Sequence, residues 1–540
     1  MKKALLSTLT LLFFSKLFAA RVYTIQGEGI FSFPIVPSSS QETIGEPKPA
    51  IGGGIGFEFR PTKSWGITGG IDYGKYSNKL AGVSDVSITN YSVDIKKYFP
   101  LNDYFTISPM AQVGLYSASR LGNYKGISTG VGIETDYKLS SIYSIYAKTG
   151  CTYFYHKDFP MMKAGCSLGF RLNLTNLFDR KGNMSVDVVE TTPIFPALYS
   201  WYNKNPFGSI KVYNQEDGTI TNVRISLYQE EFMNTPKVYE TIPMIKKNDF
   251  IDLNLTAFFN ENVLNLIEPV EKNAVINIKY DFLREERETN IPLSLYFLNR
   301  NNLSWDDDRM AAVFVCPNDS EALSFAKQVK SVVRDHLDTE ENINIQYALA
   351  LFESLHIYGL NYVVDPSSSY SANIGTSSID FLQFPYQTLN YRGGDCDDLS
   401  ILYCSLLESL GIEGAFITVP GHIYTGICLE ETEDPRAQEE IPVLYKDKIY
   451  YEGKIWQPLE ITMLKDGFVR AIRFGVEEWK KYIDEARIFP IHSNWELYSS
   501  ISSPEKKHEI MLDHKEDLLK AFLRQQYLLT GKKQKQYKDL

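Results

Sequence analysis

The chain has 540 residues and a formal net charge of −11. This length is too great for a single domain, and the negative charge makes nucleic acid an unsuitable partner. Aromatic residues make up 13% of the chain, which favours a β-rich structure. The six cysteines form no CxxC pair, so a zinc site is unsupported, and no metal-binding residues are predicted. No cofactor is implied.

Residues 1–20 have the features of a secretory signal peptide. Lys2 and Lys3 are basic, residues 4–14 are apolar, and Ala19 and Ala20 are small residues suited to cleavage. No later run is long enough for a membrane-spanning helix. The mature protein is therefore expected to be exported, and any contact with a membrane must be made in another way.

Residues 21–175 contain the clearest periodic pattern, an alternation of apolar and polar side chains that is typical of β-strands. Each run is long enough to cross a bilayer, which takes ~9–11 tilted residues. The pattern predicts an eight-stranded antiparallel β-barrel. The eight runs are 22–33, 51–60, 65–76, 86–99, 105–118, 126–137, 142–155 and 162–174.

The two faces of these runs indicate a barrel of the outer-membrane type. One face is apolar, and the other carries glycines and charges of both signs. Such a barrel turns its apolar face to lipid and fills a narrow lumen with paired charges. The alternative is a secreted, soluble β-sandwich or lipocalin-like barrel. The charged residues are Glu28, Glu58, Arg60, Asp72, Asp94, Lys96, Glu134, Asp136, Lys148, Lys163 and Arg171.

An even number of strands places both ends of the barrel on one side. The connections alternate between short turns and longer loops, and the short turns lie on the side of the chain ends. Residues 168–174 resemble the assembly signal of bacterial outer-membrane barrels. We therefore expect the rest of the chain in the periplasm and Lys79, in a longer loop, outside the cell. Cys151 and Cys166 fall on the apolar face and are expected to stay unpaired.

Residues 185–300 are predicted to form an immunoglobulin-like β-sandwich. About seven β-like runs follow one another at regular spacing, as in such sandwiches. No constellation of site residues is present, so the expected role is that of a spacer or docking module. A linker at 177–184 precedes it. The clearest runs are 209–213, 223–228, 251–255, 274–280 and 291–297.

The stretch 391–425, YRGGDCDDLSILYCSLLESLGIEGAFITVPGHIYT, carries the chemistry of the chain. Asp395 is suited to cap a helix that begins at Cys396, and apolar residues then recur at helical spacing up to a stop at Gly411. A short apolar run follows, and His422 opens the next one after a Pro-Gly break. The sequence predicts a cysteine at a helix start and a histidine at a strand start.

This arrangement suits nucleophilic catalysis. The positive end of a helix dipole favours a thiolate, and a neighbouring histidine can take the thiol proton. Glu460, in the strand-like run 455–462, can orient the imidazole. Asp395, Asp397 and Asp398 act in the opposite sense because negative charge disfavours a thiolate. The sequence leaves the sign of the net pKa shift open.

The order and spacing of four segments resemble the transglutaminase-like superfamily. They are Gly394-Asp395-Cys396-Asp397-Asp398, Leu410-Gly411-Ile412, Pro420-Gly421-His422 and residues 456–462. That family has a papain-like α+β core and a Cys-His-Asp triad. The resemblance, which covers residues 306–495, therefore implies a catalytic triad of Cys396, His422 and Glu460. This chain has Glu as the third member, and Ile423-Tyr424 follows the histidine in place of the common Ala-Trp.

Helices are expected at 320–337 and 340–355, packed under the cysteine helix, with His356 at the end of the second. Loop 367–378 is expected to border the cleft. Residues 503–540 are predicted to form a C-terminal helix, over 505–530, and a basic tail.

Together these features predict an outer-membrane-anchored periplasmic thiol enzyme. Its partners would be outer-membrane lipid and peptides, or the peptide part of the cell wall. The reaction would be hydrolysis or acyl transfer at an amide or ester bond. The alternative is a non-enzymatic anchor or binding protein with a degenerate transglutaminase-like domain.

Overall fold

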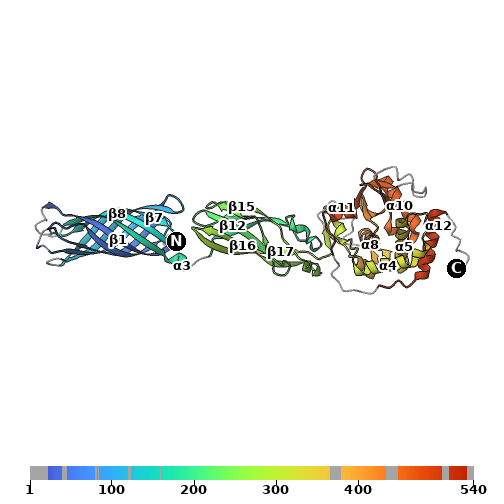
Figure 1. The fold of residues 1–540 in the computed structure, drawn as a ribbon, viewed down its shortest axis with the longest axis horizontal. Helices are drawn as coiled ribbons and strands as arrows, with labels where there is room; N and C mark the ends of the chain where they lie inside the picture. The colour runs from blue at the N-terminus through green and yellow to red at the C-terminus, as the bar shows by residue number, and fades with distance from the viewer. Residues whose placement is uncertain are drawn as a thin grey trace, which may run out of the picture.

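Three folded parts follow one another along the long axis of the molecule in a computed structural model (Figure 1). The expected signal peptide, loop 367–378 and the basic tail lie outside the residues that the structure describes. Among the described residues, no helix is long and apolar enough to cross a membrane. The described residues are 22–38, 45–79, 82, 84–119, 123–157, 160–178, 181–364, 379–432, 448–501 and 510–531.

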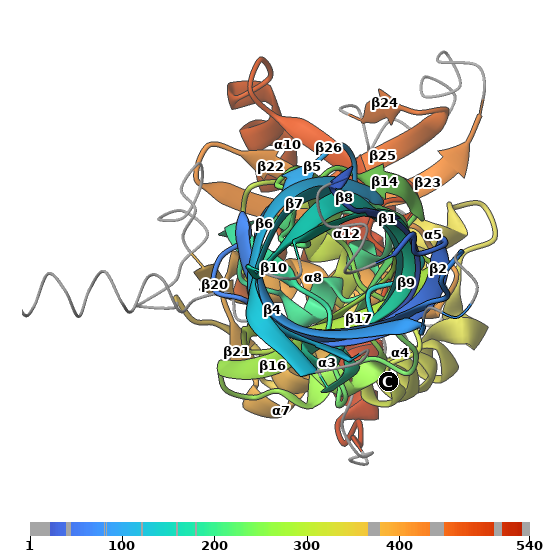
Figure 2. The ribbon, with the colours of Figure 1, turned by 90° about the vertical axis from the view of Figure 1, so that its left-hand side faces the viewer.

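The first part is a closed antiparallel β-barrel (Figure 2). The sheet order is β4-β3-β2-β1-β9-β8-β7-β6, and the pairing of β4 with β6 closes the wall of eight long strands. The two-residue β5 only extends the edge of β6. The bounds confirm the eight predicted runs. The strands are β1 (Val22–Ile35), β2 (Ala50–Arg60), β3 (Trp65–Tyr76), β4 (Val86–Lys97), β5 (Phe99–Pro100), β6 (Phe105–Ser119), β7 (Asn123–Lys138), β8 (Tyr143–Tyr155) and β9 (Met161–Asn173).

The barrel begins and ends at the same rim. The short helix α3 (Leu174–Phe178) follows β9, and the hydroxyl of Thr175 accepts a hydrogen bond from the backbone of Tyr23 at 2.9 Å. The chain therefore leaves the barrel beside its starting point, as an even number of strands requires. Helix α3 occupies part of the stretch that was expected to be a linker.

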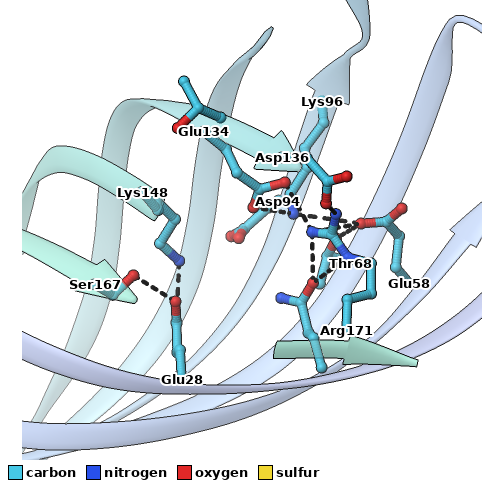
Figure 3. Close-up of polar contacts among 12 residues, drawn as sticks. Glu28, Glu58, Thr68, Asp94, Lys96, Glu134, Asp136, Lys148, Ser167 and Arg171 are labelled. Carbon is cyan, nitrogen blue, oxygen red and sulfur yellow. Dashed lines mark hydrogen bonds and ion pairs between the residues drawn. The ribbon is translucent and has the colours of Figure 1, made fainter. Parts of the chain in front are cut away.

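Charged side chains fill the barrel interior (Figure 3). The ammonium group of Lys96 lies 2.8 Å from Glu134 and 3.4 Å from Glu58. The guanidinium group of Arg171 lies 2.7 Å from Glu134 and also pairs with Asp136. These side chains are almost fully buried, which confirms the prediction of paired charges in the lumen.

The opposite end of the lumen is closed by apolar and aromatic side chains. Tyr116 and Phe154 meet edge to face at 4.9 Å between ring centroids. This cluster packs at the end of the barrel away from the chain ends, and the ion pairs of Lys96 and Arg171 lie further along the interior. The buried members are Ala50, Tyr76, Val86, Ile88, Tyr116, Ala118, Phe154 and Met161.

The middle part (residues 184–297) consists of two sheets that share a buried core. One has the order β10-β11-β15, and the other has the order β13-β12-β16-β17 with β14 paired to β12. The five strands predicted most clearly are all present. The elements are β10 (Met184–Thr191), η2 (Pro196–Leu198), η3 (Trp201–Asn203), β11 (Gly208–Asn214), β12 (Ile220–Tyr228), β13 (Lys237–Val238), β14 (Ile242–Ile245), β15 (Phe250–Leu255), η4 (Glu261–Asn265), β16 (Val270–Phe282) and β17 (Glu285–Phe297).

The C-terminal part (residues 302–530) packs helices against a sheet of order β24-β25-β23-β22-β26. Helix α8 lies at its centre, and the side chains of its first three turns are all buried. The elements are β18 (Asn302–Ser304), η5 (Asp308–Phe314), α4 (Ser320–Val333), η6 (Arg334–His336), α5 (Ile343–Tyr358), β19 (Asn361–Tyr362), β20 (Ile379–Phe381), α7 (Pro385–Tyr391), β21 (Gly393–Gly394), α8 (Cys396–Ser409), β22 (Gly414–Val419), β23 (His422–Glu431), β24 (Ile449–Tyr451), β25 (Lys454–Leu459), η8 (Ile461–Asp466), α10 (Phe468–Lys481), β26 (Arg487–Pro490), α11 (Ile491–Trp495) and α12 (Lys515–Thr530).

The predicted helices of this part are present with shifted bounds. The first two correspond to α4 with η6 and to α5. The terminal helix begins at Lys515, ten residues later than predicted, and residues 510–514 before it are not helical. The expected start was wrong because the apolar residues before the helix are buried without being helical. Ile510 and Leu512 are such residues.

Candidate active site

Cys396 is the first residue of helix α8, as predicted, and is 6% exposed. Asp395 holds the N-cap position, but its side chain makes no capping hydrogen bond. Gly394 allows a close approach beneath the helix, since a Cβ atom there would lie 2.6 Å from the Cβ of Asp398. The glycine pair before the cysteine therefore has a packing role as well as a turn role.

His422 and Glu460 form a hydrogen-bonded pair. The imidazole Nε2 lies 2.7 Å from Oε2 of Glu460. His422 opens β23, and Glu460 follows the last residue of β25 as the N-cap of η8. The other carboxylate oxygen accepts hydrogen bonds from the backbone and hydroxyl of Thr462, at 3.0 and 2.5 Å. Glu460 is thus held on both sides, by the imidazole of His422 at one oxygen and by Thr462 at the other.

The thiol of Cys396 lies against the start of the histidine strand. The backbone N–H of Ile423, next to His422, donates a hydrogen bond to the sulfur, and the charge of Glu460 acts on the thiol as well. Among the described residues, no direct hydrogen bond joins the thiol and the imidazole. Because Nε2 of His422 is engaged by Glu460, Nδ1 is the nitrogen left to accept the thiol proton.

The structure settles the direction of the thiol shift that the sequence left open. Burial raises the pKa of Cys396 above its ordinary value, and the charges of Asp397 and Asp395 raise it further. The Ile423 amide lowers it by a smaller amount. The resting side chain at neutral pH is therefore a thiol, and it needs a base to become a nucleophile.

The pKa of His422 is raised. Burial lowers it, but the hydrogen bond and the charge of Glu460 outweigh the effect of burial. A carboxylate that stabilises the imidazolium makes the neutral imidazole a stronger base, which suits a partner thiol of high pKa.

Three buried carboxyl groups surround the start of α8. Donor atoms of Asp395, Asp397 and Asp398 all lie within 4.8 Å of one another. Burial and mutual repulsion raise the pKa values of Asp397 and Asp398 well above the ordinary range. Asp398 accepts from the backbone of Gln383 at 2.7 Å, and Asp397 accepts from the backbone of Asp398 at 2.8 Å. Since protein N–H groups and shared protons hold these carboxyls, we assign no metal to them.

Helix α10 supports the third member of the site at Gly475. A Cβ atom there would lie 3.0 Å from the backbone nitrogen of Leu459 and 3.1 Å from that of Glu460. The backbone of Glu460 also donates to the carbonyl of Ala471 at 3.2 Å. The glycine therefore lets the helix sit directly against the strand end that presents the carboxylate.

Tyr362 borders the thiol and was not identified from the sequence. It pairs with Gly394 through the short parallel bridge of β19 and β21. Burial raises the pKa of Tyr362 to about 12, and the charges of Cys396 and Asp395 contribute. The side chain remains 44% exposed, so it forms part of the surface beside Cys396. The sequence pattern did not indicate this contact, which depends on the parallel pairing of β19 with β21.

The remaining cysteines and His356 lie outside this site. Cys404 is fully buried and packs beside Gly414, and all six cysteines are free. Cys151 and Cys166 are exposed on the outer face of the barrel and unpaired, as predicted. His356 lies in the last turn of α5 and is exposed.

No family model and no curated protein matches the chain. Solved structures match over the barrel. Neisserial surface protein A is 16% identical with a TM-score of 0.23, the N-terminal barrel of OprF from Pseudomonas aeruginosa is 17% identical with a TM-score of 0.19, and Ail of Yersinia pestis is 14% identical with a TM-score of 0.20. Each alignment covers 28% of this chain and 97% of the other chain. The N-terminal part resembles these outer-membrane barrels in fold alone.

Proposed function

We propose that this chain is an outer-membrane-anchored thiol enzyme whose C-terminal part, over residues 306–495, is transglutaminase-like. It acts on amide or ester bonds by hydrolysis or acyl transfer. The observation that carries the proposal is the arrangement of Cys396, His422 and Glu460: a thiol at a helix start against the histidine strand, with the imidazole held 2.7 Å from a buried carboxylate.

The anchor is the barrel, and its outer surface supports this role. Large apolar side chains remain widely exposed there: Ile51 at 78%, Ile55 at 70% and Leu168 at 70%. Such a continuous apolar band is unsuited to water and suits the hydrocarbon layer of a bilayer. Together with the charged side chains packed inside the barrel, this surface favours an outer-membrane anchor over a soluble barrel.

Both ends of the barrel would lie on the periplasmic side. The middle part, over residues 185–300, would be an immunoglobulin-like spacer, and its place between the other two parts in Figure 1 suits this role. The thiol site would then work in the periplasm. Peptides, or the peptide part of the cell wall, are the substrates within reach there.

The reaction begins when Nδ1 of His422 takes the proton from the thiol and the sulfur of Cys396 attacks the substrate carbonyl carbon. Glu460 accepts the Nε2–H of His422 and stabilises the imidazolium that forms. Backbone N–H groups at the start of α8 can donate to the oxyanion. The imidazolium then protonates the leaving amine or alcohol as its bond to carbon breaks. Water or an amine, deprotonated by His422, attacks the thioester and releases the thiol.

A test of this proposal uses p-nitrophenyl acetate and the full-length protein in non-ionic detergent. We expect a burst of p-nitrophenol and an acetyl group on the Cys396 peptide, both absent in Cys396→Ala. Equal p-nitrophenol release by both proteins, with no acetyl group on Cys396, would refute the enzyme.

The second candidate is a non-enzymatic anchor or binding protein. It is favoured by the 6% exposure of Cys396 and by the absence of a direct thiol–imidazole hydrogen bond among the described residues. The same experiment separates the two, because a degenerate site leaves Cys396 unacetylated while the protein stays folded.

A further inference from the structure

A cavity of about 320 Å³ lies where the barrel meets the middle part. Its walls come from the barrel rim that carries the chain ends and from the facing loops of the middle part. Asp103 of the rim accepts a hydrogen bond from the backbone of Thr219 at 2.9 Å, and Lys63 pairs with Asp217. The two parts therefore enclose the cavity jointly. We call it the junction chamber.

Two buried hydroxyl groups line the chamber. Thr24 is 2% exposed and Tyr98 is 5% exposed, and both line the chamber. Neither Oγ1 of Thr24 nor the Tyr98 hydroxyl has a hydrogen-bond partner among the described residues. Buried polar groups nearly always have one. Two such groups facing one cavity indicate that an acceptor or a water molecule belongs there.

The charges of the chamber distinguish between these occupants. Lys63 and Lys247 share one carboxylate, that of Asp217. Lys138 lines the chamber with no ion pair of its own among the described residues, although the charges of Asp136, Asp217 and Asp103 act on it from nearby. The lining as a whole holds six cationic side chains and three carboxylates, so positive charge is in excess. Water would satisfy the hydroxyls but would leave this local excess of positive charge, whereas an oxyanion satisfies both.

We infer that the junction chamber binds a phosphate-class oxyanion, with Lys138 as its charged partner and the hydroxyls of Tyr98 and Thr24 as donors. Lys138 and Tyr98 belong to the barrel, and Lys247 belongs to the middle part. A bound oxyanion would therefore link the two parts and hold the middle part against the barrel. The phosphate group could come from free phosphate or from a lipid headgroup.

The experiment is isothermal titration calorimetry on the full-length protein in a phosphate-free, non-ionic detergent. One titration uses inorganic phosphate, and the other uses a short-chain phosphatidylglycerol below its micelle concentration. Binding of phosphate alone identifies a free anion, and binding of the lipid alone identifies a headgroup. We expect Lys138→Met to weaken binding about tenfold, the effect of losing one charge-assisted hydrogen bond.

Two further variants keep the inference testable if Lys138→Met does not fold. Tyr98→Phe retains the ring and removes only the hydroxyl, and we expect it to weaken binding several-fold. Lys79→Met, at the opposite end of the barrel, is the matched control and should bind as the wild type does. The inference is overturned if neither ligand binds at millimolar concentration, or if Lys79→Met weakens binding as much as the chamber variants do.

Discussion

Replacement of Glu460 by Gln tests how the site is built. The carboxylate uses one oxygen for His422 and the other for Thr462. A glutamine has a single acceptor oxygen, so either the imidazole or the Thr462 amide loses its acceptor. An unsatisfied buried donor costs roughly 1–3 kcal/mol. We therefore expect a modest loss in the free energy of unfolding. We also expect the imidazole of His422 to be less well oriented and less basic.

The expected kinetic effect has two components. Loss of the carboxylate should lower p-nitrophenyl acetate turnover by about 10²–10⁴-fold, the usual contribution of an oriented base. It should lower alkylation of Cys396 by iodoacetamide less, by about tenfold or roughly 1.4 kcal/mol, because the imidazole keeps a weaker partner.

The alkylation rate of Cys396 should follow the protonation of His422. Glu460 raises the pKa of His422, so the variant should have a lower His422 pKa. Because the neutral imidazole is the base, alkylation rises as pH passes upward through this pKa. In Glu460→Gln that rise should move to lower pH while its plateau falls.

The assay is peptide-level mass spectrometry of Cys396 after timed alkylation. Peptide resolution is needed because Cys151 and Cys166 are exposed on the barrel. Glu408→Gln is the matched control, since Glu408 is also buried and its carboxylate lies 3.0 Å from Nε2 of His492, outside the site. The reasoning is refuted if Glu460→Gln keeps the wild-type plateau and pH profile, or if Glu408→Gln changes alkylation equally.

Three further outcomes are expected. Arg171→Met leaves Glu134 and Asp136 without their shared guanidinium, and it should lower the free energy of unfolding in detergent by about 3–5 kcal/mol. Lys75→Met, at an exposed ion pair, should change it by no more than about 0.5 kcal/mol. Equal melting temperatures of the two variants would contradict the lumen network. Gly475→Ala should destabilise the protein by roughly 1–3 kcal/mol and slow alkylation of Cys396, because the added Cβ would meet the Glu460 backbone. Denaturant unfolding measures the loss, with Gly426→Ala as the control, since a Cβ at Gly426 has an ordinary 3.4 Å contact. A stabilised Gly475→Ala would count against the packing argument. Trypsin added to intact cells should cut near Lys79 and spare the region around Cys396; digestion of the region after residue 185 first would reverse the proposed orientation.

The barrel could be predicted from the sequence because period-two alternation determines strands locally. Glu58 and Lys96 are buried on the inner face, and Ile55 is exposed on the outer face. This alternation assigns each strand position to one side of the barrel wall. The same local logic located Cys396 at a helix start and His422 at a strand start. Where the pattern was weak, as before Lys515, the predicted helix began too early.

Other features depend on packing that no local pattern contains. The raised pKa of Cys396 follows from burial, which is decided by every element around α8. The parallel pairing with Gly394 helps to place Tyr362 beside the thiol. The junction chamber requires two parts of the chain to meet. These are tertiary properties, and a single sequence does not specify them by its periodicity.

The most direct measurement of the central claim is the alkylation rate of Cys396 in wild type and in His422→Ala, at neutral pH on folded protein. Because burial keeps the sulfur as a thiol, its reactivity must come from the imidazole. The account predicts a loss of about 10²-fold or more in His422→Ala, the contribution of a positioned base. Equal alkylation rates in the two proteins would contradict it and leave the C-terminal part without a catalytic thiol.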